Sequence, residues 1–146
     1  MSMDTASPAS SLTADDLAFL RRPLQGFFTV AAGPLPPQPR PLWFEAADDG
    51  TIQLFTDPDA PKVRRLRQDP RASIVVASPV GEPEHWVSVA GPVTIESEGA
   101  HALLERLAAR YWDLDDPARA AQLAEMRTAD WLRIAVHPAS VRRVAG

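Results

Sequence analysis

The sequence predicts a mainly β domain of the α+β class, in which a strongly curved antiparallel barrel is flanked by helices. About six segments rich in strand-forming residues are bounded by turn signals. Glycine and proline fall near these segments and can bend a sheet. The helical patterns interrupt the strands without the regular strand and helix alternation of a parallel sheet. A barrel therefore fits better than a parallel α/β fold.

The N-terminal region divides into a tail and the first helix. Residues 1–12 are rich in serine, alanine and proline and lack the cationic and apolar parts of a signal peptide, so we expect a disordered tail. Thr13 and Asp16 form the T-x-x-D pattern of a helix start, which predicts a helix to about Arg22. Residues 13–146 are expected to form a single domain.

Three strands follow this helix. Segments 26–32 and 41–46 are rich in strand formers and flank a loop with several prolines, so we expect a hairpin. The sequence Asp48-Asp49-Gly50 is a strong turn signal. Segment 51–56 should therefore return antiparallel to segment 41–46.

The sequence in the middle of the chain predicts a helix followed by two strands. A proline and aspartate cluster after residue 56 begins a helix that contains Lys62, and segments 72–78 and 84–95 read as strands. Gly91-Pro92 interrupts the second strand. We expect a bulge or a bend at a barrel corner there, with Gly91 allowing close backbone packing.

The sequence of the last third of the chain predicts two helices and one strand. Ser97 is expected to cap a helix over 98–111, whose apolar face contains Ala102, Leu103, Leu107 and Ala108. Asp116-Pro117 begins a second helix that ends near Met126. Segment 129–136 is a late strand.

Composition excludes several classes of function. The 146 residues include no cysteine, which excludes disulfides and thiolate chemistry and is compatible with a cytoplasmic location. A net charge of −4 argues against a nucleic-acid partner, and no apolar run is long enough to span a membrane. The three histidines are far apart and lack the spacing of a zinc motif, so no metal site is expected.

Lys62 is the single lysine of the chain, beside fourteen arginines, and lies where a strand gives way to a helix. A helix N-terminus offers unpaired N–H groups and partial positive charge, to which the Lys62 ammonium and the Thr56 hydroxyl could add. This pattern suggests a phosphate site. Chance placement of a lysine on a solvated basic helix is the alternative.

Several motifs in order resemble the pyridoxamine 5′-phosphate oxidase-like, flavin-binding split barrels. Phe55-Thr56 is followed by Lys62, then by Leu66-x-x-Asp69-Pro70-Arg71-Ala72-Ser73, and later by the segment from Glu84 to Val93. The resemblance covers roughly residues 17–95, and the late strand with Trp131 agrees with it. It implies a split β-barrel, a flavin cofactor and a homodimer whose subunits share the cofactor groove.

The resemblance also implies which residues bind the cofactor, expected to be FMN. The strand formed by Arg40, Pro41, Leu42, Trp43 and Phe44 would run along the flavin, and Phe55 and Thr56 would lie near its phosphate. Lys62 matches a phosphate-binding lysine. Pro61 replaces the arginine that often precedes this lysine, and Arg64, Arg65 or Arg40 could compensate. Trp86 takes the position of a residue that contacts the ring from the partner subunit.

Because side chains alternate along a strand, we expect Trp43 to face outward while Leu42 and Phe44 fill the barrel. We also expect the late strand with Trp131 to close the sheet beside Trp86. A core position for the strand aromatics is the competing interpretation. The C-terminal arginine segment of true pyridoxamine-phosphate oxidases is not recognisable after Arg133, which argues against vitamin B6 chemistry.

The predicted function is an FMN-dependent oxidoreductase that acts on an unidentified small molecule, with no catalytic acid or base evident. Three alternatives remain open. The same fold could bind a deazaflavin, whose acidic tail would suit Arg64 and Arg65. It could serve as a non-catalytic flavin carrier or sensor, or as an interaction module that has lost the cofactor.

Overall fold

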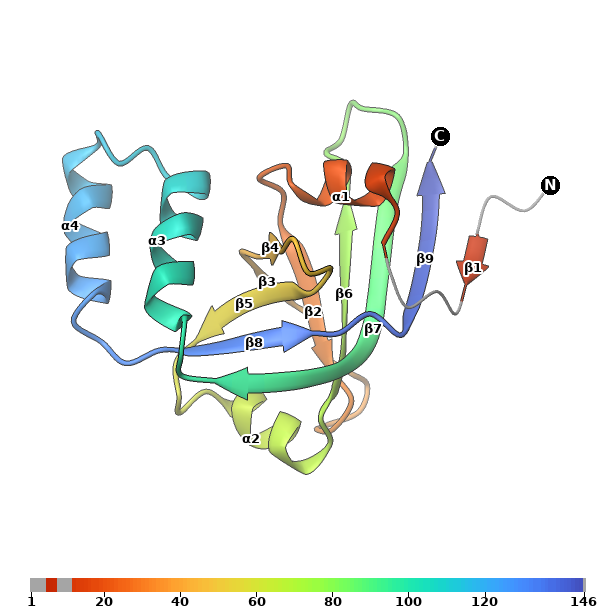
Figure 1. Ribbon diagram of the computed structural model, residues 1–146, viewed down its shortest axis with the longest axis horizontal. Coiled ribbons are helices and arrows are strands. Elements are labelled where there is room, and N and C mark those ends of the chain that lie inside the picture. The colour runs from red at the N-terminus through yellow and green to blue at the C-terminus, as the bar shows by residue number, and fades with distance from the viewer. Residues whose placement is uncertain (1–4, 8–11, 146) are drawn as a thin grey trace.

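A computed structural model describes residues 5–7 and 12–145 and shows a curled antiparallel sheet with helices on its outside (Figure 1). The helices are α1 (Ala14–Leu20), α2 (Pro61–Gln68), α3 (Ala100–Tyr111) and α4 (Pro117–Met126). The strands are β1 (Thr5–Ser7), β2 (Gly26–Val30), β3 (Arg40–Leu42), β4 (Glu45–Ala46), β5 (Ile52–Thr56), β6 (Arg71–Ala77), β7 (His85–Glu96), β8 (Leu132–Val136) and β9 (Ser140–Ala145).

The sheet has the strand order β3-β2-β6-β7-β8-β5-β4, and β9 pairs with both β7 and β1. The two ends of this path, β3 and β4, are separated in the sequence only by Trp43 and Phe44. The strand predicted over 41–46 is therefore two short strands in different parts of the sheet. β3 pairs with β2, as the predicted hairpin requires, and β4 pairs with β5.

The long strand β7 turns the corner of the barrel, as the Gly91-Pro92 interruption predicted. Its first part pairs with β6 and β9, whereas Val93 to Glu96 pair with β8. A Cβ atom on Gly91 would collide with the carbonyl oxygen of His137. Glycine is needed here because two backbones pass too closely for any side chain.

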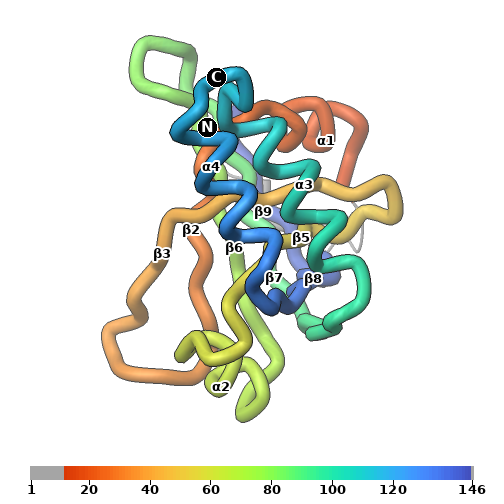
Figure 2. Tube along the Cα trace, turned by 90° about the vertical axis from the view of Figure 1, so that its left-hand side faces the viewer, coloured from red at the N-terminus to blue at the C-terminus, as the bar shows by residue number. Residues whose placement is uncertain are grey.

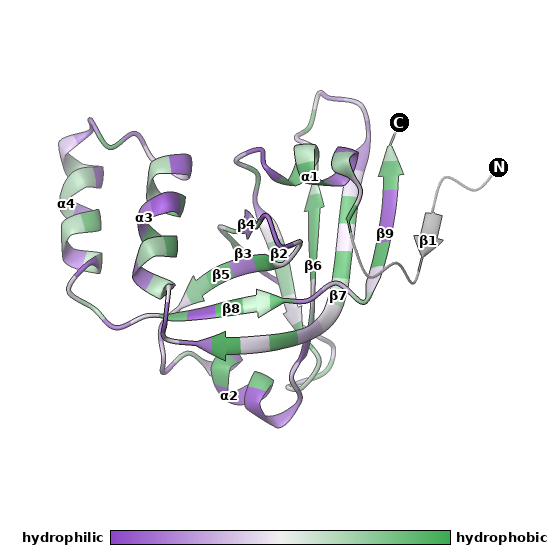
Figure 3. Ribbon diagram, in the orientation of Figure 1, coloured by the Kyte–Doolittle hydropathy of each residue, from purple (hydrophilic) through white to green (hydrophobic). Residues whose placement is uncertain are grey.

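Two apolar clusters stabilise the fold. The barrel core contains fully or almost fully buried side chains from the longer strands, including Leu54, Ile74, Val87 and Ile134, and Phe44 from the link between β3 and β4. A second, smaller cluster lies between the barrel and the α3–α4 hairpin, which covers one side of the sheet (Figure 2). Both helices of this hairpin carry apolar and polar residues side by side (Figure 3), as expected for helices with one covered face.

The predicted helix starts are partly confirmed. Thr13 and Asp16 form the expected capping box, and Asp116 caps α4. The predicted Ser97 cap of α3 is wrong, because the helix begins at Ala100 and its N-cap is Gly99. Gly99 has a φ of 80°, a left-handed conformation that favours glycine.

The predicted apolar face of α3 needs one correction. Ala102 is exposed, and Leu104 takes its place among the buried residues. Residues 103, 104, 107 and 108 have the spacing of the buried face of an amphipathic helix, and residue 102 lies outside this face.

Strand β9 was not predicted. It follows directly on β8 and lies along the first part of β7, with Val141 and Val144 buried. Much of the expected disordered tail falls outside the described residues, and its segment Thr5–Ser7 is described as β1, paired with β9. In the described part of the chain, no helix has both the length and the apolar character needed to cross a bilayer.

Candidate functional site

A cavity of about 420 Å³ lies between β2, β3 and the start of α2, and three of the predicted site residues line it. Arg40, Lys62 and Arg65 contribute cations from β3 and from the first turns of α2. The remaining lining consists of Phe28, Val30, Gln38 and Pro61. Pro61 occupies the first turn of α2, where its fixed φ suits a helix start and its missing N–H is no loss, and it places Lys62 at the cavity.

Lys62 is half-buried, and its Nζ lies 5.9 Å from the centroid of the Phe28 ring. Burial lowers the pKa of Lys62, and the nearby charge of Arg40 lowers it further. Within residues 12–145, none of the seven salt bridges includes Lys62, Arg40 or Arg65. The cavity therefore gathers three cations that an anion could neutralise, in a chain whose net charge is negative.

Two neighbouring residues lie outside this cation cluster. Arg64 is exposed and donates a hydrogen bond of 3.1 Å to the carbonyl oxygen of Asp59. Arg65, rather than Arg64, is the α2 arginine that lines the cavity. Thr56 is buried, and its hydroxyl donates to the carbonyl oxygen of Asp57 at 3.4 Å. Thr56 does not line the cavity, so the structure does not bring it together with Lys62.

A second cavity, of about 310 Å³, lies where the α3–α4 hairpin meets β3 and β5. It contains four more of the predicted residues: Pro41, Leu42, Trp43 and Phe55. Gln25, Trp112 and Met126 complete its lining. The lining is apolar except for the Gln25 amide and the indole nitrogens.

Aromatic contacts form the wall of this second cavity. Trp43 stacks on Tyr111 and meets Trp112 edge-on at 4.8 Å between centroids. Phe55 packs edge-on against both Trp43 and Trp131. The Trp131 indole donates a hydrogen bond of 2.8 Å to the carbonyl oxygen of Met126, which joins the end of α4 to the barrel.

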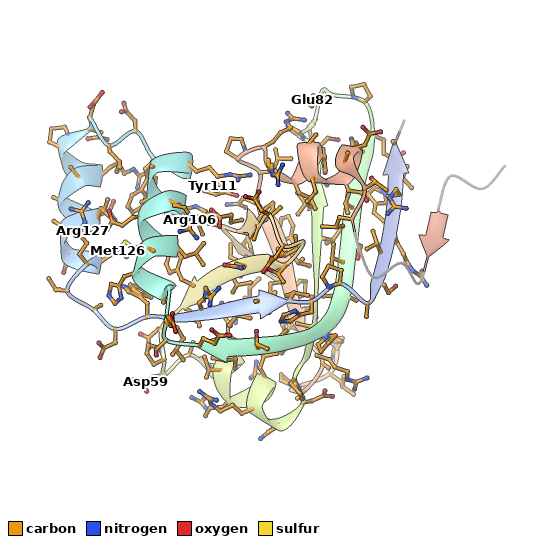
Figure 4. All side chains as sticks on the ribbon, in the orientation of Figure 1. Asp59, Glu82, Arg106, Tyr111, Met126 and Arg127 are labelled. Carbon is orange, nitrogen blue, oxygen red and sulfur yellow. The ribbon has the colours of Figure 1, made fainter. Side chains whose placement is uncertain are left out.

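The side chains of Arg106 and Tyr111 extend from α3 toward the barrel (Figure 4) and make polar contacts with it. The Tyr111 hydroxyl donates a hydrogen bond of 2.6 Å to the carbonyl oxygen of Leu24, and burial raises the pKa of Tyr111. Arg106 forms a bidentate ion pair with Glu45 on β4, with its shorter contact at 2.8 Å. These contacts hold the aromatic wall in place from the α3 side.

Phe44 fills the core and Trp43 lies outside it in the second cluster, as the alternation predicted, but Leu42, also expected inside the barrel, is only half-buried and lines the second cavity. Phe44 has no exposed surface, so its side chain cannot touch a ligand without rearrangement of the core. Trp86 lies in register with Ala77 and Val144, on the part of β7 remote from β8. The expected placement of Trp131 beside Trp86 is wrong, because β8 pairs with the other end of β7.

Three residues that line the second cavity were not predicted, Gln25, Trp112 and Met126, and neither was Tyr111, which stacks on Trp43. Tyr111 and Trp112 are adjacent aromatic residues at the very end of a predicted helix, and this doublet was the signal available in the sequence. The described residues contain no cluster of three histidine or acidic side chains that could hold a metal ion.

Comparison with protein families identifies the chain. A model of the family described as pyridoxamine 5′-phosphate oxidase matches residues 13–142. The chain belongs to this family. The match extends well beyond the motifs around Lys62 and includes every strand from β2 to β8 and the first residues of β9. No curated protein sequence matches the chain.

Solved structures share the pyridoxamine 5′-phosphate oxidase-like fold. A conserved hypothetical protein, Rv2991 from Mycobacterium tuberculosis, has a TM-score of 0.69 and 19% identity, covering 94% of this chain and 88% of its own. A structure named F420 reductase has a TM-score of 0.65 and 23% identity, covering 85% and 93%. A FAD-binding protein from Mesorhizobium loti has a TM-score of 0.58 and 18% identity, covering 97% and 99%. At these identities the likeness establishes the fold.

Proposed function

We propose that this protein is an FMN-dependent oxidoreductase that holds its cofactor noncovalently. The observation that carries the proposal is the group of three cations, Arg40, Lys62 and Arg65, around one cavity without an acidic partner in the described chain. Burial is the main cause of the lowered pKa of Lys62, and repulsion from the charge of Arg40 lowers it further. A phosphate dianion would relieve this repulsion and receive charge-assisted hydrogen bonds.

The position of β3 supports a cofactor that has a phosphate at one end and a ring at the other. Arg40 lines the cationic cavity, while Pro41 and Leu42, the next two residues, line the apolar cavity. Lys62 and Arg65 would hold the phosphate with Arg40. Trp43 and Phe55 would contribute apolar surface to the edge of the ring at the mouth of the apolar cavity, whose interior would stay free for a second ligand.

A bound flavin would supply the redox chemistry, because its ring carries and transfers the electrons. The chain's own residues would neutralise the phosphate, orient the cofactor and limit the access of water to the ring. No acidic or basic side chain lines the apolar cavity. A proton needed there would come from solvent.

We include a homodimer in this proposal. Phe27 and Val75 lie opposite each other on β2 and β6, on the outer face of the sheet, and are 41% and 36% exposed. Trp86 lies on the same face, because it is two residues from Ser88, the partner of Val75. A second subunit would cover this apolar face and could bring its own Trp86 to the shared groove.

A deazaflavin is the second candidate cofactor. The structure named F420 reductase shares the fold. Arg64, one helical position from the cavity residue Arg65 and exposed, could meet an acidic tail that extends out of the cavity. This candidate leaves the role of Lys62 unchanged.

The visible spectrum of the protein as purified, and after addition of each cofactor to apo protein, tests the proposal. We expect the yellow spectrum of an oxidised flavin and saturable binding of FMN. A deazaflavin spectrum, or tight binding of deazaflavin alone, would favour the second candidate. A colourless protein that binds neither compound would contradict both.

A further inference from the structure

We propose that the apolar cavity beneath the α3–α4 hairpin binds a planar, uncharged aromatic ring of the substrate. That the ligand is a substrate rests on the proposed oxidoreductase function. That the cavity binds such a ring rests on its lining alone. Its wall consists of Trp43, Phe55, Trp112 and Met126, which come from the barrel and from both ends of the hairpin.

The arrangement of the aromatic side chains favours a flat ligand. Trp43 and Trp112 are perpendicular, with an interplanar angle of 89°, and Phe55 meets Trp43 at 68°. Such a corner offers the face of one ring and the edge of another, the two surfaces that an aromatic guest prefers. The Met126 thioether adds a flexible, polarisable contact.

The charges around the cavity favour a neutral ligand. No acidic or basic side chain lines it. The guanidinium of Arg119 already lies 4.8 Å from the centroid of the Trp112 ring, so a cationic ligand on that indole would be repelled. An anion would find its counter-charges at the other cavity, beside Lys62.

The cavity is open to solvent where the barrel meets the α3–α4 hairpin, so a ligand can enter it. A volume of about 310 Å³ is at the small end of the range for ligand pockets and suits one or two rings. The cavity also opens beside Pro41 and Leu42, next to the strand that would carry the cofactor.

Binding of 2-naphthol, a planar and uncharged two-ring probe that needs no redox partner, tests the proposal. Two matched compounds serve as controls: 2-naphthoate carries a negative charge, and decahydro-2-naphthol is not planar. Methyl-labelled methionine gives a local signal, because Met126 lines the cavity and the sequence has only two other methionines. The Met126 signal is assigned with Met126→Leu.

Three variants separate the cavity from the surface. Met126→Trp fills the cavity from α4, and Gln25→Trp closes it from an exposed rim position that leaves the core untouched. Glu125→Trp adds the same side chain to the exposed neighbour of Met126. We expect each of the first two to weaken 2-naphthol binding at least tenfold and Glu125→Trp to leave it unchanged.

Each result supports or overturns the proposal. Support requires a shift of the Met126 signal, at least tenfold weaker binding of both control compounds, and retained 2-naphthol binding in FMN-saturated protein. The proposal would be overturned if 2-naphthol did not shift the Met126 signal, or if both filling variants bound 2-naphthol with unchanged affinity. Competition between FMN and 2-naphthol would also overturn it, by assigning the cavity to the cofactor ring. Binding of 2-naphthol by a protein that binds no flavin would support the aromatic site and contradict the oxidoreductase proposal.

Discussion

Trp43 stacks on Tyr111 with their ring planes 5° apart and their centroids separated by 5.2 Å. This contact joins the link between β3 and β4 to the end of α3. The Tyr111 hydroxyl is fixed in turn by its hydrogen bond to the carbonyl oxygen of Leu24. The two residues therefore couple the closure of the sheet to the docking of the α3–α4 hairpin.

Tyr111→Phe should lower the free energy of unfolding by about 1 kcal/mol, because it leaves the half-buried carbonyl oxygen of Leu24 without this donor and keeps the stacking. Tyr111→Ala should cost about 3 to 5 kcal/mol, because it also removes the ring. Urea denaturation measures both. Equal losses in the two variants would contradict a separate contribution from the stacked ring.

Phe27→Glu should convert the expected homodimer into a monomer. The substitution places a charge opposite Val75 on the exposed apolar face of the sheet, where a partner subunit would desolvate it. Light scattering at micromolar concentration measures the mass of both proteins. A wild-type monomer would contradict the dimer and, with it, a groove shared between subunits.

Asp16→Asn should lower the free energy of unfolding by about 2 to 4 kcal/mol, because it leaves Arg143 without its carboxylate partner and weakens the capping box of α1. Burial raises the pKa of Asp16, but hydrogen bonds from Arg143 and Thr13 outweigh it, and the net pKa is lowered. The native state therefore binds this proton less readily than the unfolded chain. The stabilisation should be complete above the unfolded-state pKa and decline as the pH falls through the native one.

Denaturation of wild type and Asp16→Asn as a function of pH checks this. The two curves should converge in acid. As a control, Asp69→Asn removes an ion pair with Arg71 that also lowers the pKa of Asp69 but is screened by solvent, so it should change the pH dependence less than Asp16→Asn does. A constant difference between wild type and Asp16→Asn at all pH values would contradict the account.

Much of the fold could be predicted from the sequence because proline, glycine and aspartate mark the ends of its elements. The capping box at Thr13, the Asp116 cap and the bend at Gly91 are local signals, and the structure contains all three. β9 carried no such signal. Its two buried valines flank Arg142 and Arg143, so the segment lacks the apolar alternation of a strand, and its strand conformation depends on pairing with β7.

The site could be predicted only in part, because cavities form between elements that are distant in the chain. Lys62 was identified from its local context. The grouping of Arg40 with Arg65 depends on how β3 meets α2, and the aromatic wall depends on how the α3–α4 hairpin folds back on Trp43. Trp43, at the second cavity, lies in the break of two residues between β3 and β4, which no turn residue marks.

FMN affinity should fall as the pH rises through the pKa of Lys62, because only the charged ammonium neutralises the phosphate. Burial and then Arg40 lower this pKa, so the loss should begin at a lower pH than for an exposed lysine. Titrations across the alkaline range measure the effect. Lys62→Arg is the control, because its guanidinium stays charged there. A decline shared by both proteins would exclude Lys62 as the titrating group.

The measurement that tests the central claim most directly is the titration of apo protein with FMN in wild type, Lys62→Ala and Arg67→Ala. Arg67 lies exposed on the same helix, outside the cationic cavity, and controls for lost charge on α2. We predict that Lys62→Ala weakens FMN binding by about 1 to 3 kcal/mol, or about 5- to 150-fold, with an unchanged fold, while Arg67→Ala binds like wild type. Equal affinity in wild type and Lys62→Ala would contradict a phosphate site at Lys62 and the flavin function built on it.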